Sequence, residues 1–283
     1  VGGALGSVGG GDDNGGATLG GLELNFRSKG GGFPHGTLET ILDTLEGKAP
    51  KRREGDPYFY PKEYRGAANA ALSVSSFVLP KYQLGQFTGP NFMSVINVPV
   101  LCRAAPALGF SSELSISDKS VMSGRPSLLN GYGLFPVQAY ITALIVGGVV
   151  LALPPFRWLL RGRLKTYSCG GDPSGKVFLD ARGTSANGGP SATARCVFPG
   201  DPGIYATGLF AAAVANALHE ATAPGSKHPM PLAGFNSPLA ALHGCREGLL
   251  VDHLRAAGCT IKVEVGEEGK VREVDAAKLR SKL

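Results

Sequence analysis

The sequence predicts an α+β domain, in which a mixed or antiparallel sheet is covered by helices and one helix is long and apolar. Apolar and polar residues alternate from Leu22 to Arg27, which is the pattern of a half-buried strand. Apolar residues recur at helical spacing from Leu38 to Leu45. A stretch without any charged residue runs from Pro136 to Leu153 and supplies the long helix.

Composition divides the chain into three predicted regions. Residues 1–21 are Gly-rich and have few large apolar side chains, so we expect a flexible linker. Residues 22–265 are expected to form the folded domain, which contains an apolar segment at 136–160. Residues 266–283 are charged, and we expect a C-terminal tail in the form of a frayed or exposed helix.

The N-terminal elements follow from periodicity and from turn residues. A helix is predicted from Thr37, as its N-cap, to the stop at Gly47. The stretch 68–80 fits either a strand or a short helix. The apolar stretch that follows Met93 also fits a helix or a strand, and Pro99 is expected to limit it.

In the C-terminal part, strands are predicted from Lys176 and over 191–198, followed by an Ala- and Leu-rich helix after Pro202. A last helix should end at Gly258, and a strand should cover 261–265. The segment "GGDPSGK" has the glycine and lysine spacing of a phosphate-binding loop, but a strand pattern follows it where that loop needs a helix. We therefore predict a hairpin turn between two strands there.

Composition also limits the classes of partner that we expect. Charged residues make up 18% of the chain, below the roughly 25% that is usual for soluble domains. The net charge is +6, but the basic residues form no face with interleaved aromatic residues, so nucleic-acid binding is not expected. The five cysteines are widely spaced and lack a CxxC pair, which favours free thiols in a non-secretory compartment.

No catalytic motif stands out in the sequence. The five histidines form no HExxH or HxH pair, and no GxSxG segment is present, so catalytic residues stay unassigned and no metal site is predicted. The first glycines contain no GxGxxG pattern, so no cofactor site is predicted in this chain either.

The apolar segment 136–160 is the main candidate site. As a helix, Pro136–Leu153 would extend about 27 Å, against roughly 30 Å for a bilayer core, and Pro154 and Pro155 should end it. Three interpretations stay open: an anchor on a membrane surface, a buried core or subunit-contact helix, and a true span. The basic and aromatic residues that follow resemble a membrane interface. The predicted membrane or partner contacts are Tyr140, Ile141, Leu144, Ile145, Val149, Phe156, Arg157, Trp158, Leu160, Arg161 and Arg163.

Five segments, taken in order, resemble the saccharopine dehydrogenase-like oxidoreductases. The likeness covers roughly residues 22–265, and it departs from the family pattern at Pro99, which interrupts the second segment. The segments are "GGFPHGTLETILDTLEG", "FTGPNFMSVINVPVLCRAAPALG", the apolar stretch with "FRWLLRGRLK", "CVFPGDPGIYATGLFAAAVANAL" and "GFNSPLAALHGCREGLLVDHLRAAGCTIKV".

This resemblance implies the C-terminal, substrate and membrane half of an NAD(P)-dependent oxidoreductase, without catalysis of its own. No cofactor would be bound by this chain alone, and NAD(P) would need a Rossmann half supplied elsewhere. The implied partners are a membrane surface or lipid, a Rossmann-domain chain or a second copy. The implied location is intracellular, on a mitochondrial, plastid or lipid-droplet membrane. The alternative is a non-catalytic structural or lipid-contacting subunit of a larger assembly.

Overall fold

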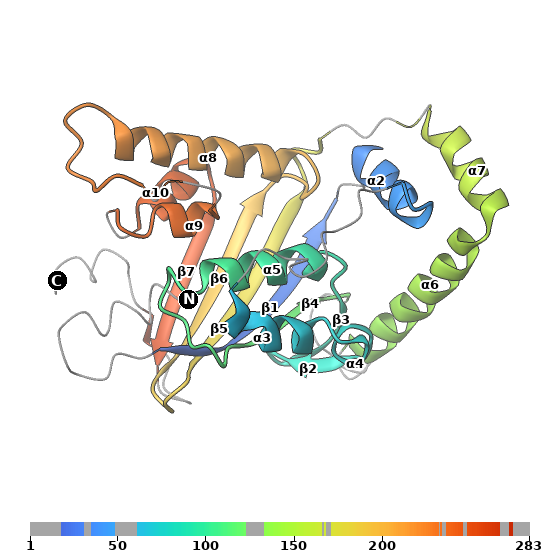
Figure 1. Ribbon diagram of the computed structural model, residues 1–283, viewed down its shortest axis with the longest axis horizontal. Coiled ribbons are helices and arrows are strands. Elements are labelled where there is room, and N and C mark those ends of the chain that lie inside the picture. Colours follow the sequence, from blue (N-terminus) through green and yellow to red (C-terminus); the bar gives the residue numbers. More distant parts are fainter. Residues whose placement is uncertain are drawn as a thin grey trace.

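The structure is a computed structural model of the 283-residue chain, and it describes residues 18–30, 35–48, 61–122, 133–165, 167, 171–231, 233, 236–245, 248–266 and 272–273. Its centre is a sheet with the strand order β2-β3-β4-β1-β5-β6-β7-β8 (Figure 1). The strands are β1 (Leu19–Lys29), β2 (Lys81–Gln83), β3 (Gln86–Pro90), β4 (Ser115–Ser120), β5 (Lys176–Ser185), β6 (Ser191–Pro199), β7 (Thr260–Gly266) and β8 (Arg272–Glu273). The helices are α2 (His35–Leu45), η1 (Lys62–Tyr64), α3 (Arg65–Ala71), α4 (Val74–Val78), α5 (Ser94–Ala104), α6 (Leu134–Ala152), α7 (Pro154–Leu164), α8 (Tyr205–Thr222), α9 (Pro238–Ala241) and α10 (Leu249–Ala256).

The sheet is mixed. Strands β1 and β4 run parallel, and the other described neighbours run antiparallel. The connection from β1 to β4 carries α2, α3 and α5, as a crossover between parallel strands requires. The prediction of an α+β domain with a mixed sheet and one long apolar helix is confirmed.

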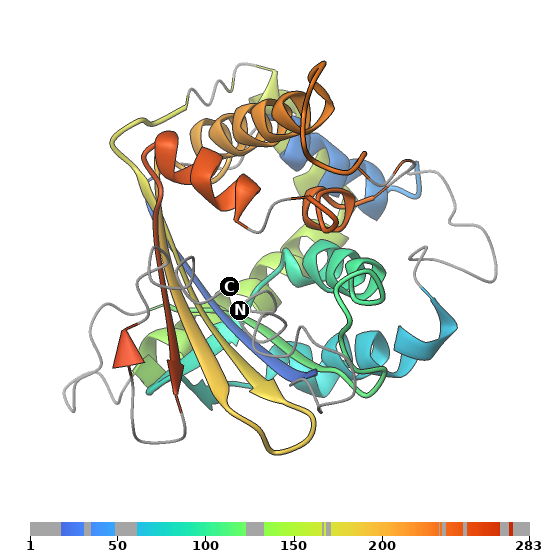
Figure 2. The same ribbon diagram turned by 90° about the vertical axis from the view of Figure 1, so that its left-hand side faces the viewer.

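The two faces of the sheet differ in chemistry. Leu22, Leu24 and Phe26 of β1 lie on the face that packs against the buried clusters, and helices α3, α5, α8 and α10 gather on that side (Figure 2). Because side chains alternate along a strand, Glu23 and Arg27 lie on the opposite face. Along β5, β6 and β7, no described helix covers that opposite face, which we call the open face.

Separate apolar clusters stabilise the covered side. One lies beneath α3 and α5 and includes Leu19, Val98 and Ile116. Another lies beneath α8 and α10, where the Phe198 and Phe210 rings pack at a centroid distance of 4.7 Å. Alanines on α8 let that helix approach its neighbours closely, and the buried ones are Ala206, Ala213, Ala217 and Ala221.

The turn before α8 is fixed by a buried carboxylate. Asp201 is 0% exposed, and its oxygens accept hydrogen bonds from the backbone N–H groups of Asp172, Gly203, Ile204 and Tyr205, at 2.6, 2.9, 3.0 and 3.3 Å. These donors include groups at the start of α8 that have no partner within the helix. Asp201 therefore joins the turn before β5 to the start of α8.

Helix α5 runs through Pro99, so the expectation that this proline limits the element is wrong. The missing N–H leaves the Val95 carbonyl without its helical donor. Val95 is 46% exposed, so water can supply that hydrogen bond. Pro99 itself is buried within the protein.

The boundaries of the folded domain are wider than predicted. Strand β1 begins at Leu19, which is 2% exposed, so residues 19–21 belong to the sheet and not to a linker. In the tail, β8 pairs Arg272 with Val265, so a short strand stands where a helix was expected. Residues 1–17, 267–271 and 274–283 lie outside the described residues.

Two local predictions need correction, and others are confirmed. Helix α2 begins at His35, so Thr37 lies inside its first turn and is not the N-cap. The turn at 172–175 precedes β5, but the element that comes before it among the described residues is helix α7 and not the predicted strand. Gly47 and Gly258 have φ angles of 69° and 91° and follow α2 and α10, as predicted.

Candidate functional site

Helices α6 and α7 form an arm that projects beside the sheet (Figure 1). We call residues Leu134–Leu164 the arm. The helix ends at Ala152, because Leu153 is extended and Pro154 starts a new helix, as the double proline predicted. The arm therefore consists of a longer apolar helix, a break and a shorter basic helix.

The root of α6 is buried within the protein. Val137 and Ile141 are 0% and 5% exposed, and Val137 lies against Gly89 of β3, where an added Cβ would come within 3.3 Å of it. Ile141, predicted as a membrane or partner contact, is therefore covered by the protein itself. Tyr140 is half-buried beside the same glycine.

Beyond this root, α6 is exposed around most of its circumference. Ile145 and Val149 are 57% and 62% exposed, and Leu144 and Val146 are exposed as well. Only 11% of the most apolar window of α6 is buried in the protein. The interpretation of α6 as a core helix therefore fails for its outer half, which presents apolar side chains to its surroundings.

One face of α7 packs against α2 through charged groups. The Arg161 guanidinium contacts the Glu46 carboxylate at 3.0 and 2.9 Å and the Asp43 carboxylate at 2.5 Å. Arg157 donates a hydrogen bond to the carbonyl of Leu45 at 2.9 Å. The bonds from Arg161 hold the pKa of Glu46 near 2. These two arginines, predicted as membrane contacts, are instead engaged within the protein.

The opposite face of α7 is apolar. Trp158 is 78% exposed, and Phe156 and Leu159 are exposed beside it. At 100° per residue, Leu159 lies about 160° from both Arg157 and Arg161, whereas Trp158 lies to the side, about 100° from Arg157 and 60° from Arg161. Arg163 is exposed near the C-terminal end of the helix, and Leu160 is half-buried between the two faces. The structure thus turns Arg157 and Arg161 toward α2 and leaves Phe156, Trp158 and Leu159 exposed.

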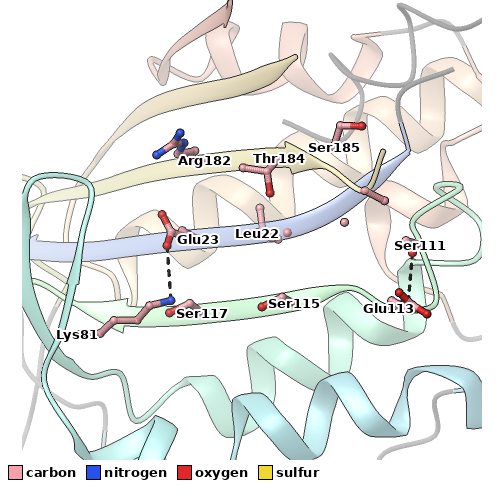
Figure 3. A pocket seen from close by; sticks show the side chains of 13 residues that line it. Leu22, Glu23, Lys81, Ser111, Glu113, Ser115, Ser117, Arg182, Thr184 and Ser185 are labelled. Atoms are coloured by element: carbon pink, nitrogen blue, oxygen red, sulfur yellow. Dashed lines mark hydrogen bonds and ion pairs between the residues drawn. The ribbon is translucent and has the colours of Figure 1, made fainter. Parts of the chain in front are cut away.

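A polar groove of about 450 Å³ lies on the open face (Figure 3). Glu23 of β1 stands between Lys81 of β2 and Arg182 of β5, and it pairs with Lys81 at 3.5 Å. Hydroxyl groups complete the lining, and Ser117 donates to Gln83 at 2.7 Å. The groove suits a small polar ligand. Its Glu23 and Ser117 side chains already have partners within the protein.

Buried polar residues on β4 tie helices to the sheet. The carboxylate of Asp118 accepts hydrogen bonds from Asn91 and Asn97, at 2.8 and 2.9 Å, and burial raises its pKa. The Lys119 ammonium donates to the carbonyls of Ser76 and Leu79, and burial lowers its pKa to about 8. These groups hold α4 and α5 in place, and they line part of a hollow of about 760 Å³ that is bordered by α3, α4 and β4.

Among the described residues we find neither a metal-binding centre nor a centre for thiol chemistry. No group of three His, Cys, Asp or Glu side chains there could hold a metal ion. The nearest approach is Glu220, which contacts His253 at 3.0 Å and His228 at 3.6 Å. The four described cysteines are free thiols, and burial raises the pKa of each of them.

Sequence reasoning missed the partners of the arm and the groove. The i, i+3 spacing of Asp43 and Glu46 on a predicted helix could have suggested a basic neighbour, but not which one. The polar positions of β1 indicated a solvent-facing side of a strand. Which strands meet Glu23 across that side depends on the sheet order, which a single sequence does not encode.

Comparison of the chain with models of protein families, with curated proteins and with solved structures found no match in any of the three.

Proposed function

We propose that this chain is a membrane-associated domain that binds the surface of an intracellular membrane through its arm. The observation that carries the proposal is the outer half of the arm, where apolar side chains of α6 and the Trp158 face of α7 are exposed together. Exposed apolar surface of this extent on a soluble domain marks a contact with a partner or a lipid phase. Tryptophan beside basic residues favours the membrane interface.

Surface binding fits the arm better than a span. In the first turns of α6, Val137 and Ile141 are buried against β3, so the helix is free of buried residues only from Thr142 onward. From Thr142 to Leu153 a helix extends about 18 Å, well below the roughly 30 Å of a bilayer core. We therefore propose shallow insertion of the arm among the headgroups and the upper acyl chains.

The only tryptophan of the chain reports on this proposal directly. Trp158 is on the outer face of α7, so we expect its fluorescence emission to shift to shorter wavelength when phosphatidylcholine vesicles are added. Emission that stays unchanged over a vesicle titration would contradict insertion. A blue shift that follows protein concentration without vesicles would indicate instead that the arm joins two copies of the chain.

For its chemistry, we propose that the domain is the C-terminal half of a saccharopine dehydrogenase-like oxidoreductase and does not catalyse alone. The resemblance of five sequence segments supports this proposal. NAD(P) would be held by a dinucleotide-binding domain supplied elsewhere, and this chain would supply the membrane contact. The alternative is a structural or lipid-contacting subunit without any catalytic role.

Titration of the purified chain with NADH and NADPH tests the cofactor part of this proposal. We expect no saturable change in nucleotide fluorescence, because the chain has no GxGxxG segment to cradle a pyrophosphate. Saturable binding of either nucleotide would show a cofactor site within this chain, and that result would refute both the proposed division of labour and the structural alternative.

A further inference from the structure

Three cationic side chains gather at one corner of the open face. Phe26 and Val177 pack into the covered side, so Arg27 and Lys29 of β1 and Lys176 of β5 point to the open face. Lys29 stands directly opposite Lys176 in the antiparallel register, and Arg27 stands opposite Phe178. We call Arg27, Lys29 and Lys176 the cationic corner.

The cationic corner lacks acidic partners within the described structure. Two other basic residues of the open face form ion pairs: Lys81 with Glu23 at 3.5 Å, and Arg195 with Asp180 at 3.0 Å. Among the residues that the structure describes, no ion pair involves Arg27, Lys29 or Lys176. Asp172 lies close by, against Gly30, and its carboxylate accepts hydrogen bonds from Ser174. One carboxylate offsets only part of the charge of three cations, so the corner keeps a net positive charge.

The guanidinium of Arg27 is held in a defined place. Its central carbon lies 4.5 Å from the centre of the Phe178 ring, which supports the flat group by a cation–π contact. A supported guanidinium loses less freedom when it binds an oxyanion, and its fork matches two oxygens of a phosphate. The Cα atoms of Lys29 and Lys176 lie about 7 Å further along the same face of the strands.

Like charges directly opposite one another in a sheet are unfavourable. Lys29 and Lys176 form such a pair. We propose that the cationic corner binds the phosphate group of a phosphate monoester. A dianionic phosphate with three terminal oxygens would neutralise the lysine pair and accept from the Arg27 fork at once. The monoester could belong to a soluble metabolite or to a lipid headgroup. The site goes beyond the proposed membrane contact and does not require the arm.

The substitution Lys29→Glu tests this site without loss of the fold. We expect glycerol 3-phosphate to bind the wild-type chain saturably in calorimetry, and the variant to bind at least about tenfold more weakly. The melting temperature should not fall, because the new carboxylate stands opposite Lys176 and replaces a repulsive pair by an attractive one. Loss of binding therefore cannot come from unfolding.

Lys227→Glu is the matched control, because it changes the net charge equally at an exposed position beyond the far end of α8. The proposal is overturned if both variants lose binding to the same extent. It is also overturned if wild type binds no glycerol 3-phosphate and binds vesicles no better when they contain phosphatidic acid.

Vesicles with phosphatidic acid, compared with vesicles containing equal phosphatidylserine, separate a lipid source of the phosphate from a soluble one. Trp158→Glu should leave glycerol 3-phosphate binding unchanged, so failure of the arm proposal is seen separately.

Discussion

Replacement of Asp201 by alanine is expected to destabilise the fold by roughly 3 kcal/mol, because four backbone N–H groups lose their acceptor at a site without access to water. The loss would loosen two elements at once, since these donors belong to the turn before β5 and to the start of α8. Urea unfolding followed by circular dichroism measures this loss as a lower transition midpoint.

The same residue predicts a dependence of stability on pH. Burial alone would raise the pKa of Asp201, but the four backbone donors outweigh it and hold the pKa below its ordinary value of 3.8. A carboxyl whose folded-state pKa is depressed stabilises the fold above its unfolded pKa and loses that contribution as pH falls through the folded value. The difference in stability between wild type and Asp201→Ala should therefore be constant near neutral pH and shrink in acid.

Asp180→Ala is the matched control for this experiment. Asp180 also carries a carboxylate on the β5 side of the sheet, but it pairs with the exposed Arg195, so its removal should change stability by less than about 1 kcal/mol. Equal destabilisation by the two variants would show that Asp201 has no special role at the start of α8.

Local pattern was enough to predict several of the elements, and the reason is physical. The alternation in β1 and β7, the helical spacing in α2 and the double proline after α6 act through neighbours in the chain. Pro99 was misjudged because its cost depends on what surrounds the helix: Pro99 is buried, and Val95 is exposed enough for water to reach its carbonyl. The residues packed around α5 therefore decide whether Pro99 ends the helix or is tolerated within it.

The candidate site was harder to predict, because its meaning depends on contacts between distant residues. Arg157 and Arg161 looked like ligands for an anionic surface, yet their partners lie on α2, more than a hundred residues earlier in the chain. The cationic corner is the converse case. Arg27, Lys29 and Lys176 look unremarkable in sequence and become neighbours only through the register between β1 and β5.

The internal pairing of the arginines changes how the arm should be tested. A charge reversal at Arg157, Arg161 and Arg163 would break the contacts between α7 and α2, so loss of membrane binding could follow from detachment of α2. Trp158 and Leu159 lie on the outer face of α7 and are 78% and 53% exposed. Their replacement changes the proposed membrane surface and leaves the α2 contact intact.

The double variant Trp158→Glu, Leu159→Glu is therefore expected to lose vesicle binding by roughly a hundredfold or more, because burying each apolar side chain contributes about 1.5–3 kcal/mol and about 1.4 kcal/mol equals a factor of ten. Flotation with phosphatidylcholine vesicles measures the loss, and the melting temperature should stay at the wild-type value. Met230→Glu places the same charge at a side chain that is 79% exposed in the segment that follows α8, and it should float like wild type. If the double variant floats undiminished, the arm does not enter lipid, and its apolar face must be assigned to a protein partner.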